Sequence, residues 1–435
     1  MSKAKPEADV EQVQMETVSK HALETLLSVS LCVPISGDPS SEEVVWGLPT
    51  LFWGAPGIGK SERAEMAAAR LGLSCEVIFP STMQPEDVNG VLVPDGKGGA
   101  TKVCMLDGVR ALIAAKKGVL FIDEATGARP ATQGALLGAI LKRQFGDVKM
   151  PNAVRIVAAA NPPDQAAGGW DLEPPMANRF AHFDIGKPRA DEWVNYLLSQ
   201  NAPRDTSILD YEDVLKQNWP AAWAKVQGFF AGFHKKSNGR LLHKMPGEGA
   251  KDRGRAWPSP RTWTFAARSA ATCMALRGVL TATSVDADDL MLDFISACVG
   301  PGASGEFTTW LRETNLPDPE KVLQDGWTPD KLRIDRNYAV YTSMVAFVTG
   351  TKDEERRLKY AAQAYNVLEV ASDTGFKDLI APNVSQLINR GMGVNMIMSP
   401  EPAKKRVGEA AGRILAKLGK THIGGMIKEY AKESS

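Results

Sequence analysis

The sequence predicts an α/β fold in which a parallel sheet is followed by a helical lid and an additional C-terminal helical region. Three apolar runs, at residues 48–53, 119–122 and 154–160, have the character of strands buried in a sheet. A glycine-rich segment and then an Ala-, Glu- and Arg-rich helix pattern, at 62–71, follow the first run. Beyond residue 188 apolar side chains recur at helical spacing. This succession favours an α/β core that precedes a purely helical part.

The glycine-rich segment matches the phosphate-binding pattern G-x-x-x-x-G-K-S/T at every fixed position; its residues are Gly54, Ala55, Pro56, Gly57, Ile58, Gly59, Lys60 and Ser61. Glycines let such a loop curl so that its N–H groups point at phosphates, and the next helix adds its positive end. Lys60 would reach the β- and γ-phosphates, and the Ser61 hydroxyl would bind Mg²⁺. The flanking strand and helix patterns disfavour a chance match, so the segment predicts binding of a nucleoside triphosphate with Mg²⁺.

Two carboxylates follow the apolar run 119–122 directly, at Asp123 and Glu124. Ligands of open α/β sheets bind at the carboxyl ends of the strands, which places both side chains near the phosphate loop. Asp123 would face Mg²⁺ opposite Ser61, and Glu124 would activate the water that attacks the γ-phosphorus. Taken alone, the pair is an ordinary strand end; together with the loop, it favours hydrolysis.

Two further residues stand beside predicted strands. Asn161 follows the run 154–160, where it could orient the attacking water or contact the γ-phosphate, although Asn-Pro alone is only a turn. Arg179 precedes the strand-like segment 181–185. Its guanidinium could stabilise charge in phosphoryl transfer if a neighbouring subunit presents it, and a surface arginine is the alternative.

The order of these motifs resembles that of AAA+ ATPases, and within them the MoxR family, over about residues 45–300. Segments 80–90, 121–137 and 257–261 carry the resemblance further. It implies a P-loop parallel sheet core, sensor 1 at Asn161, an arginine finger at Arg179 and a sensor-2 arginine at Arg261 in the lid. Two departures are Ala125-Thr126-Gly127 after Glu124, and Asn178 where an Asp is usual.

The same resemblance implies an ATP-hydrolysing chaperone that works as a hexameric ring and remodels or matures a protein client. Its partner would be a separate polypeptide with a von Willebrand factor A domain. Two alternatives stay open: a nucleotide-gated assembly scaffold with slow hydrolysis, and a DNA-dependent AAA+ motor. Two observations argue against the DNA-dependent motor. The net charge is zero, from 51 basic and 51 acidic residues, and the sequence has no recognisable nucleic-acid-binding motif.

Two segments read as β-hairpins, at residues 91–103 and 142–152. The resemblance implies that both hairpins face the central channel of a ring or the surface of a partner. Four cations on them could contact an acidic partner or a phosphate backbone, or could simply be solvated: Lys97, Lys102, Lys142 and Arg143.

The remaining composition favours a cytoplasmic protein. The five cysteines are scattered and include no C-x-x-C pair, which argues against disulfides and a zinc site. No apolar run reaches the length of a signal segment or of a membrane span.

Composition divides the chain into a flexible segment at 1–19, an ATPase core at 20–187, a lid at 188–300 and a helical region at 301–435. Two aromatic and apolar groups are expected in the lid core: Trp193, Tyr196, Leu197 and Leu198, and then Trp223, Val226, Phe229, Phe230 and Phe233. A break is expected at 301–305, followed by helices at 338–348, 354–372, 376–390 and 404–432. The last helix is basic and amphipathic, so it either docks on an acidic partner or membrane surface or packs within the fold.

Overall fold

The computed structural model describes residues 21–94, 101–104, 106–146, 148–162, 170–199, 209–250 and 252–419. The chain divides into two compact units. The first comprises Met1–Lys216 and His243–Gly305, and the second comprises Gln217–Leu242 and Glu306–Ser435. The expected segment 1–19 and the tip of the first hairpin, with Lys97, lie outside the described residues.

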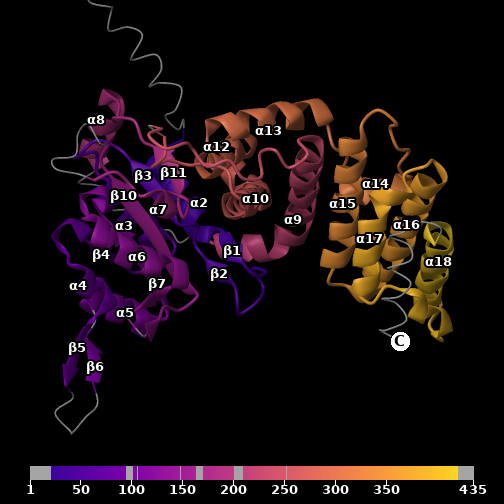
Figure 1. The fold of residues 1–435 in the computed structure, drawn as a ribbon, viewed down its shortest axis with the longest axis horizontal. Helices are drawn as coiled ribbons and strands as arrows, with labels where there is room; N and C mark the ends of the chain where they lie inside the picture. Colours follow the sequence, from indigo (N-terminus) through magenta and orange to yellow (C-terminus); the bar gives the residue numbers. More distant parts are fainter. Residues whose placement is uncertain are drawn as a thin grey trace, which may run out of the picture. The chain divides into compact units, whose positions relative to one another are not determined.

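A five-stranded parallel sheet forms the centre of the first unit, which confirms the predicted fold class (Figure 1). The central strands are almost wholly buried, as their continuous apolar sequences predict. The predicted strands at 119–122, 154–160 and 181–185 are confirmed. In spatial order the strands are β11 (Ala181–Asp184), β3 (Thr50–Trp53), β10 (Ala153–Ala160), β7 (Lys117–Ile122) and β4 (Cys75–Ile78).

Helices follow or surround these strands. The predicted helix at 62–71 is confirmed as α3 (Lys60–Arg70), which starts directly after the phosphate loop. The other helices of this part are α2 (Leu23–Cys32), α4 (Pro85–Asn89), α5 (Asp107–Ala115), α6 (Pro130–Lys142), α7 (Pro174–Ala177) and α8 (Ala190–Ser199), with 3₁₀ turns η1 (Pro80–Thr82) and η2 (Ala125–Gly127). After the long α9 (Tyr211–Lys236) come α10 (Pro260–Ala275), α11 (Arg277–Ala282) and α12 (Ala287–Val299).

Both predicted hairpins are confirmed as antiparallel pairs. They are β5 (Val91–Pro94) with β6 (Thr101–Cys104), and β8 (Gln144–Phe145) with β9 (Val148–Lys149); a third pair joins β1 (Pro34–Ser36) to β2 (Val45–Trp46). We expected Arg143 to be a free charge on the second hairpin, and this expectation is wrong. Its Nη2 donates to the carbonyl oxygen of Pro151 at 3.1 Å, and burial lowers its pKa to about 10. Arg143 therefore braces the base of the hairpin, whereas Lys142 is exposed.

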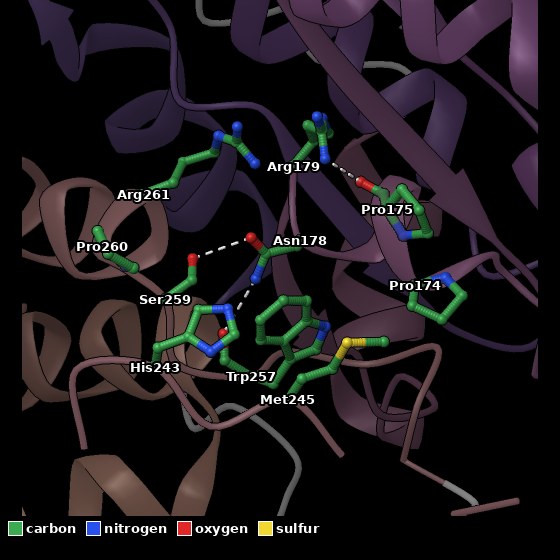
Figure 2. Close-up of a pocket in the computed structure, with 10 residues that line it drawn as sticks. All are labelled: Pro174, Pro175, Asn178, Arg179, His243, Met245, Trp257, Ser259, Pro260 and Arg261. Carbon is green, nitrogen blue, oxygen red and sulfur yellow. Dashed lines mark hydrogen bonds between the residues drawn. The ribbon is translucent and has the colours of Figure 1, made fainter. Parts of the chain in front are cut away.

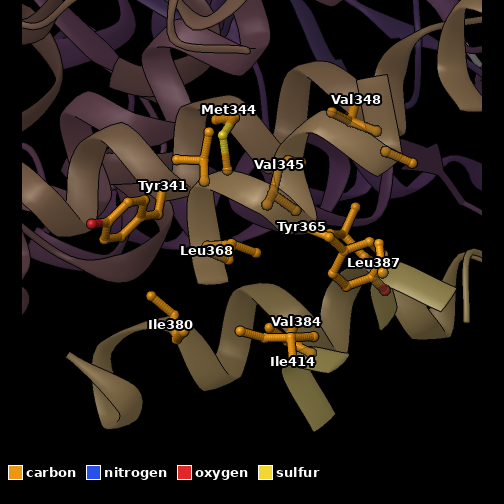
Figure 3. Packing of buried hydrophobic residues seen from close by; sticks show 14 of the residues in the cluster. Tyr341, Met344, Val345, Val348, Tyr365, Leu368, Ile380, Val384, Leu387 and Ile414 are labelled. Atoms are coloured by element: carbon orange, nitrogen blue, oxygen red, sulfur yellow. The ribbon is translucent and has the colours of Figure 1, made fainter. Parts of the chain in front are cut away.

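The second unit is a helical assembly with its own apolar core (Figure 3). Three of its helices contribute fully buried side chains to this core, among them Tyr341, Tyr365 and Leu387. The predicted helices at 338–348, 354–372 and 376–390 are confirmed. The helices are α14 (Pro319–Asp325), α15 (Ile334–Gly350), α16 (Glu354–Asp373), α17 (Lys377–Asn389) and α18 (Pro402–Leu418), with the 3₁₀ segment η3 (Val394–Met398).

The helix α18 packs within the fold. Its apolar residues Ile414, Leu415 and Leu418 are buried in the core of the second unit, so the packed-helix interpretation holds up to Leu418. The rest of the predicted helix lies outside the described residues. Among the helices that the structure describes, none is both long and apolar enough to span a bilayer.

The expected break at 301–305 is wrong, because these residues begin α13 (Pro301–Thr314). The interruption lies one residue earlier, at Gly300, whose φ is 82°. Proline is favoured at the first position of a helix, since its fixed φ suits the helix and its missing N–H would have no partner there. Pro301 therefore starts the helix that we expected it to prevent.

The two groups expected in the lid core have different outcomes: the first is not in a core, and the second is buried. On α8, the side chains of Trp193 and Leu198 are 55% and 71% exposed. The aromatic residues of α9 are core residues, but of the second unit, because residues 217–242 belong to it. There the ring of Phe230 lies 4.8 Å from that of Phe307. The helical spacing was real, but spacing alone does not say which core a helix joins.

Candidate functional site

The phosphate loop connects β3 to α3 at the carboxyl edge of the sheet. Gly57 and Gly59 adopt left-handed backbone conformations, with φ of 81° and 80°. A side chain at either position would meet no atom of the described residues within 4 Å, so the backbone conformation, rather than lack of space, requires glycine. Lys60 is the first residue of α3, which directs the positive end of this helix at the loop.

The Lys60 side chain lies across the loop and contacts the neighbouring strand. Its Nζ donates to the carbonyl oxygens of Gly54 at 2.7 Å and Ala55 at 3.1 Å, and to Oδ1 of Asn161 at 3.0 Å. Burial lowers the pKa of Lys60, and the charges of Asp123 and Glu124 oppose this effect. The structure thus brings together two of the predicted site residues, Lys60 and Asn161.

Ser61 and Asp123 also meet, because the Ser61 hydroxyl donates to Oδ2 of Asp123. Ser61 comes from the first turn of α3, and Asp123 directly follows β7. Mg²⁺ prefers oxygen ligands, and it is usually bound by one or two carboxylates together with substrate phosphates and water. A hydroxyl and a carboxylate beside a phosphate loop fit that chemistry.

Glu124 lies next to this pair with its backbone in the left-handed region, at φ 52°. Its amide donates to Oδ1 of Asp123 at 2.9 Å, and Ser81 Oγ donates to Oε2 of Glu124 at 3.2 Å. Sequence reasoning assigned no role to Ser81. The signal was available, because Ser81 follows β4, the strand next to β7, and therefore reaches the same edge of the sheet.

Arg179 and Arg261 lie together, but apart from the phosphate loop. Both line a pocket of 440 Å³, none of whose lining residues belongs to the loop (Figure 2). Ala181 pairs with Thr50, the first residue of β3, whereas the loop follows the last residue of β3. Arg179 thus lies at the amino end of this strand pair. At about 3.3 Å per residue, the strand separates it by about 10 Å from the end where the loop begins.

The two guanidinium groups affect each other. Arg179 donates through Nη1 to the carbonyl oxygen of Pro175 at 2.6 Å, and its pKa is lowered by burial and by the charge of Arg261. A pair of like charges with this effect is a favourable place for an anion. Among the described residues, neither the phosphate loop nor the carboxylates that follow β7 provide an anion for these two arginines.

Asn178 connects the segment before β11 to the start of α10. It is 4% exposed, its Nδ2 donates to the carbonyl oxygen of Trp257 at 3.2 Å, and its Oδ1 accepts from Ser259 Oγ at 2.9 Å (Figure 2). An aspartate could not donate to Trp257, so the amide explains why Asn stands where the resemblance leads us to expect Asp. Ser259 is in turn the N-cap of α10, and Arg261 lies in its first turn.

Comparison with known proteins finds one family model that matches part of the chain. Residues 49–180 match the model of an AAA domain, dynein-related subfamily. Among curated proteins, none matches the chain. Solved structures that match include a candidate ATPase from Cytophaga hutchinsonii, with 15% identity, coverage of 71% of this chain and 94% of that one, and a TM-score of 0.41. A likeness at this level carries no weight for function.

Proposed function

We propose that this chain, which carries an AAA ATPase domain, binds ATP with Mg²⁺ and hydrolyses it as a MoxR-like AAA+ protein. One observation supports this most strongly. Lys60 reaches Asn161 while the adjacent Ser61 reaches Asp123, so residues from three separate segments converge beside one phosphate loop. If the loop matched the phosphate-binding pattern only by chance, there would be no reason for Asp123 and Asn161 to contact its residues.

Each residue would have a distinct role in hydrolysis. The loop amides and Lys60 would neutralise the β- and γ-phosphates, while Ser61 and Asp123 would hold Mg²⁺, which supplies charge stabilisation when bound. Glu124 would accept a proton from the attacking water, and Asn161 would orient that water or contact the γ-phosphate. The nucleophile would be water, so products are ADP and phosphate.

We propose further that the protein acts as a ring, hexameric by resemblance, in which Arg179 and Arg261 reach the triphosphate bound by a second copy. The position of Arg179 at the opposite end of its strand pair from the loop supports this assignment. In the ring, hydrolysis would remodel a protein client, and the von Willebrand factor A partner rests on the resemblance alone.

The test of hydrolysis is ATP turnover and nucleotide binding in three variants. Lys60→Ala should lose binding; Glu124→Gln should keep binding and lose turnover by about 100-fold or more, because it cannot act as a base. Glu86→Gln, at an exposed position on α4, is the matched control and should behave as wild type. Equal turnover in Glu124→Gln and wild type would overturn the role of Glu124.

Mixing tests the shared site. Arg179→Ala and Glu124→Gln proteins should each be inactive, but a mixture should regain part of the turnover, because some interfaces then combine an intact arginine with an intact carboxylate. If mixing restores no turnover, Arg179 does not act across copies. The Glu124→Gln protein with ATP should also retain client and partner for identification.

A scaffold with slow hydrolysis is the second candidate, and the hydrogen bond from Ser81 to Glu124 favours it, because this contact holds the carboxylate that should activate water. The same turnover assay decides between the two, since a scaffold predicts ATP-dependent assembly with turnover that Glu124→Gln leaves unchanged.

A further inference from the structure

Arg255 lies against the strand that leads into the phosphate loop. Its guanidinium carbon is 4.0 Å from the centroid of the Trp53 ring, and its Nη1 donates to Oδ1 of Asp184 at 2.8 Å. Trp53 is the last residue of β3, Asp184 is the last residue of β11, and the two pair in register. One side chain therefore contacts the carboxyl ends of two neighbouring strands, at the edge of the sheet where the loop begins.

Trp53 is connected directly to the loop. The carbonyl oxygen of the next residue, Gly54, accepts from Lys60 Nζ at 2.7 Å. The Gly54 amide donates to the carbonyl oxygen of Ala160 at 3.1 Å, and the Ile185 amide donates to the carbonyl oxygen of Trp53 at 2.7 Å. A shift of Trp53 would therefore move the carbonyl group that Lys60 contacts.

Two partners fix the orientation of the Trp53 side chain. Its Nε1 donates to Nδ1 of His182 at 3.0 Å, and the guanidinium of Arg255 lies over its ring. The side chains of Arg255 and Asp184 are 32% and 38% exposed. An ion pair this exposed contributes little to the stability of a whole protein, whereas a guanidinium over an indole is attracted to the ring. We therefore expect the contact to order the end of β3 more than it stabilises the fold.

Arg255 belongs to the segment that leads into α10. Further along this segment, the carbonyl oxygen of Trp257 accepts from Nδ2 of Asn178, and Ser259 Oγ donates to Oδ1 of Asn178. Asn178 precedes β11, whereas Asp184 ends it. The segment is thus held near both ends of β11, so the guanidinium of Arg255 extends from a backbone that is itself fixed.

We propose that Arg255 is a positioning residue for the phosphate loop, because it fixes Trp53 and thereby the Gly54 carbonyl group that Lys60 contacts. The inference rests on the proposed function, since this loop is the one proposed to bind the triphosphate. Arginine suits the role because its planar guanidinium can lie on a ring and donate along its edge to a carboxylate at the same time. The ammonium of a lysine is a point charge, which cannot make both contacts in this way.

Hydrogen exchange of the protein without nucleotide tests the contact directly. In Arg255→Gln, peptides that cover residues 50–61 and 181–187 should exchange about three- to tenfold faster, because the ends of β3 and β11 open more often without the guanidinium. Arg277→Gln is the matched control, since Arg277 also forms an exposed ion pair, with Asp288 at 2.8 Å. The control should leave both peptides unchanged. Unchanged exchange in Arg255→Gln overturns the inference.

Nucleotide affinity and turnover distinguish positioning from a purely structural role. Arg255→Gln should weaken binding of a fluorescent ATP analogue about three- to tenfold, while turnover at saturating ATP and the urea midpoint stay at the values of Arg277→Gln. Arg255→Lys should recover part of the lost affinity, because it keeps the charge. Three results contradict the inference: wild-type affinity in Arg255→Gln, lost turnover at saturating ATP with unchanged affinity, or lost affinity together with a lower urea midpoint than the control.

The two proposals can fail separately. If wild type binds no ATP analogue, the proposed function fails, and faster exchange in Arg255→Gln would still show that Arg255 orders the loop. If wild type binds and hydrolyses ATP while Arg255→Gln matches it in exchange and affinity, only the inference about Arg255 fails.

Discussion

The ammonium group of Lys60 lies 3.0 Å from Oδ1 of Asn161, a residue 101 positions further along the chain. The two meet because β10 runs parallel to β3 in register, with Ala160 paired to Trp53, so both strands deliver their following residues to one edge of the sheet. The contact links the phosphate loop to the strand at the centre of the sheet.

Replacing Asn161 should impair hydrolysis more than binding. We expect Asn161→Ala to lower the turnover number about 10- to 100-fold, because one polar group that positions water or the γ-phosphate is lost, while the loop amides still hold the nucleotide. Asn152→Ala, before the other end of β10, is the control and should leave turnover unchanged. Measured turnover and nucleotide affinity separate the two effects; wild-type turnover in Asn161→Ala would contradict the role.

The sequence was sufficient to predict the centre of the fold and the convergence at its edge. Strands such as β7 and β10 are buried on both faces, so their continuous apolar sequences distinguish them from amphipathic elements. Because the ends of parallel strands share one edge, the residues after them could be grouped before any coordinates were known. Asp123 and Asn161 were found in this way.

The sequence was not sufficient where the partner of an element decides its role. The aromatic spacing of α9 is the same whether the helix packs in a lid or, as it does, against Phe307 of the second unit. Likewise, Arg143 has the sequence context of a hairpin-tip cation, and only the fold directs it to the carbonyl of Pro151. Helical periodicity predicts a buried face, but not what buries it.

Stability should fall in mild acid because of His182. Its Nδ1 accepts from Trp53 Nε1 at 3.0 Å and its Nε2 donates to the carbonyl oxygen of Ala177 at 2.9 Å, so the ring is neutral. Burial lowers its pKa from 6.5 to about 4; the bond to Ala177 opposes the shift and Arg255 adds to it. Below pH 6.5, His182 therefore binds a proton in the unfolded chain, whereas in the folded chain it binds one only near pH 4.

This stabilisation is complete above pH 6.5 and is lost as the pH falls toward 4. Its loss should amount to about 2 kcal/mol at pH 5. The matched variant is His182→Gln, whose amide can both accept from Trp53 and donate to Ala177 but does not titrate. Urea unfolding at pH 7.5 and 5.0 should show a smaller loss for the variant; equal losses in both proteins would rule out His182 as the source.

Gly47 should tolerate no side chain. Its φ is 89°, and a Cβ there would lie 2.5 Å from Cγ of Arg155. Arg155 cannot move aside, because it is 1% exposed and donates to the carbonyl oxygens of Leu31 at 3.2 Å and Ala153 at 2.6 Å. Gly47→Ala should therefore cost about 2–4 kcal/mol, from backbone strain and overpacking together.

Gly72 provides the comparison for backbone strain alone. Its φ is 65°, and a Cβ would meet nothing within 4 Å among the described residues. Gly72→Ala should cost only about 1 kcal/mol, the usual penalty of a left-handed alanine. Denaturant unfolding of both variants measures the difference, and equal costs would show that the Arg155 contact contributes nothing.

Two buried tyrosines in the core of the second unit should respond oppositely to loss of their hydroxyls. The Tyr365 hydroxyl donates to the carbonyl oxygen of Met392 at 2.6 Å, so Tyr365→Phe leaves that carbonyl without its donor and should cost about 1–2 kcal/mol. The Tyr341 hydroxyl is equally buried but has no partner among the described residues. Tyr341→Phe removes the cost of burying an unsatisfied polar group and should be neutral or stabilising by up to about 1 kcal/mol. Both free energies of unfolding come from urea titration at pH 7.5, and a loss of similar size in the two variants would mean that packing of the rings, rather than hydrogen bonding, governs this core.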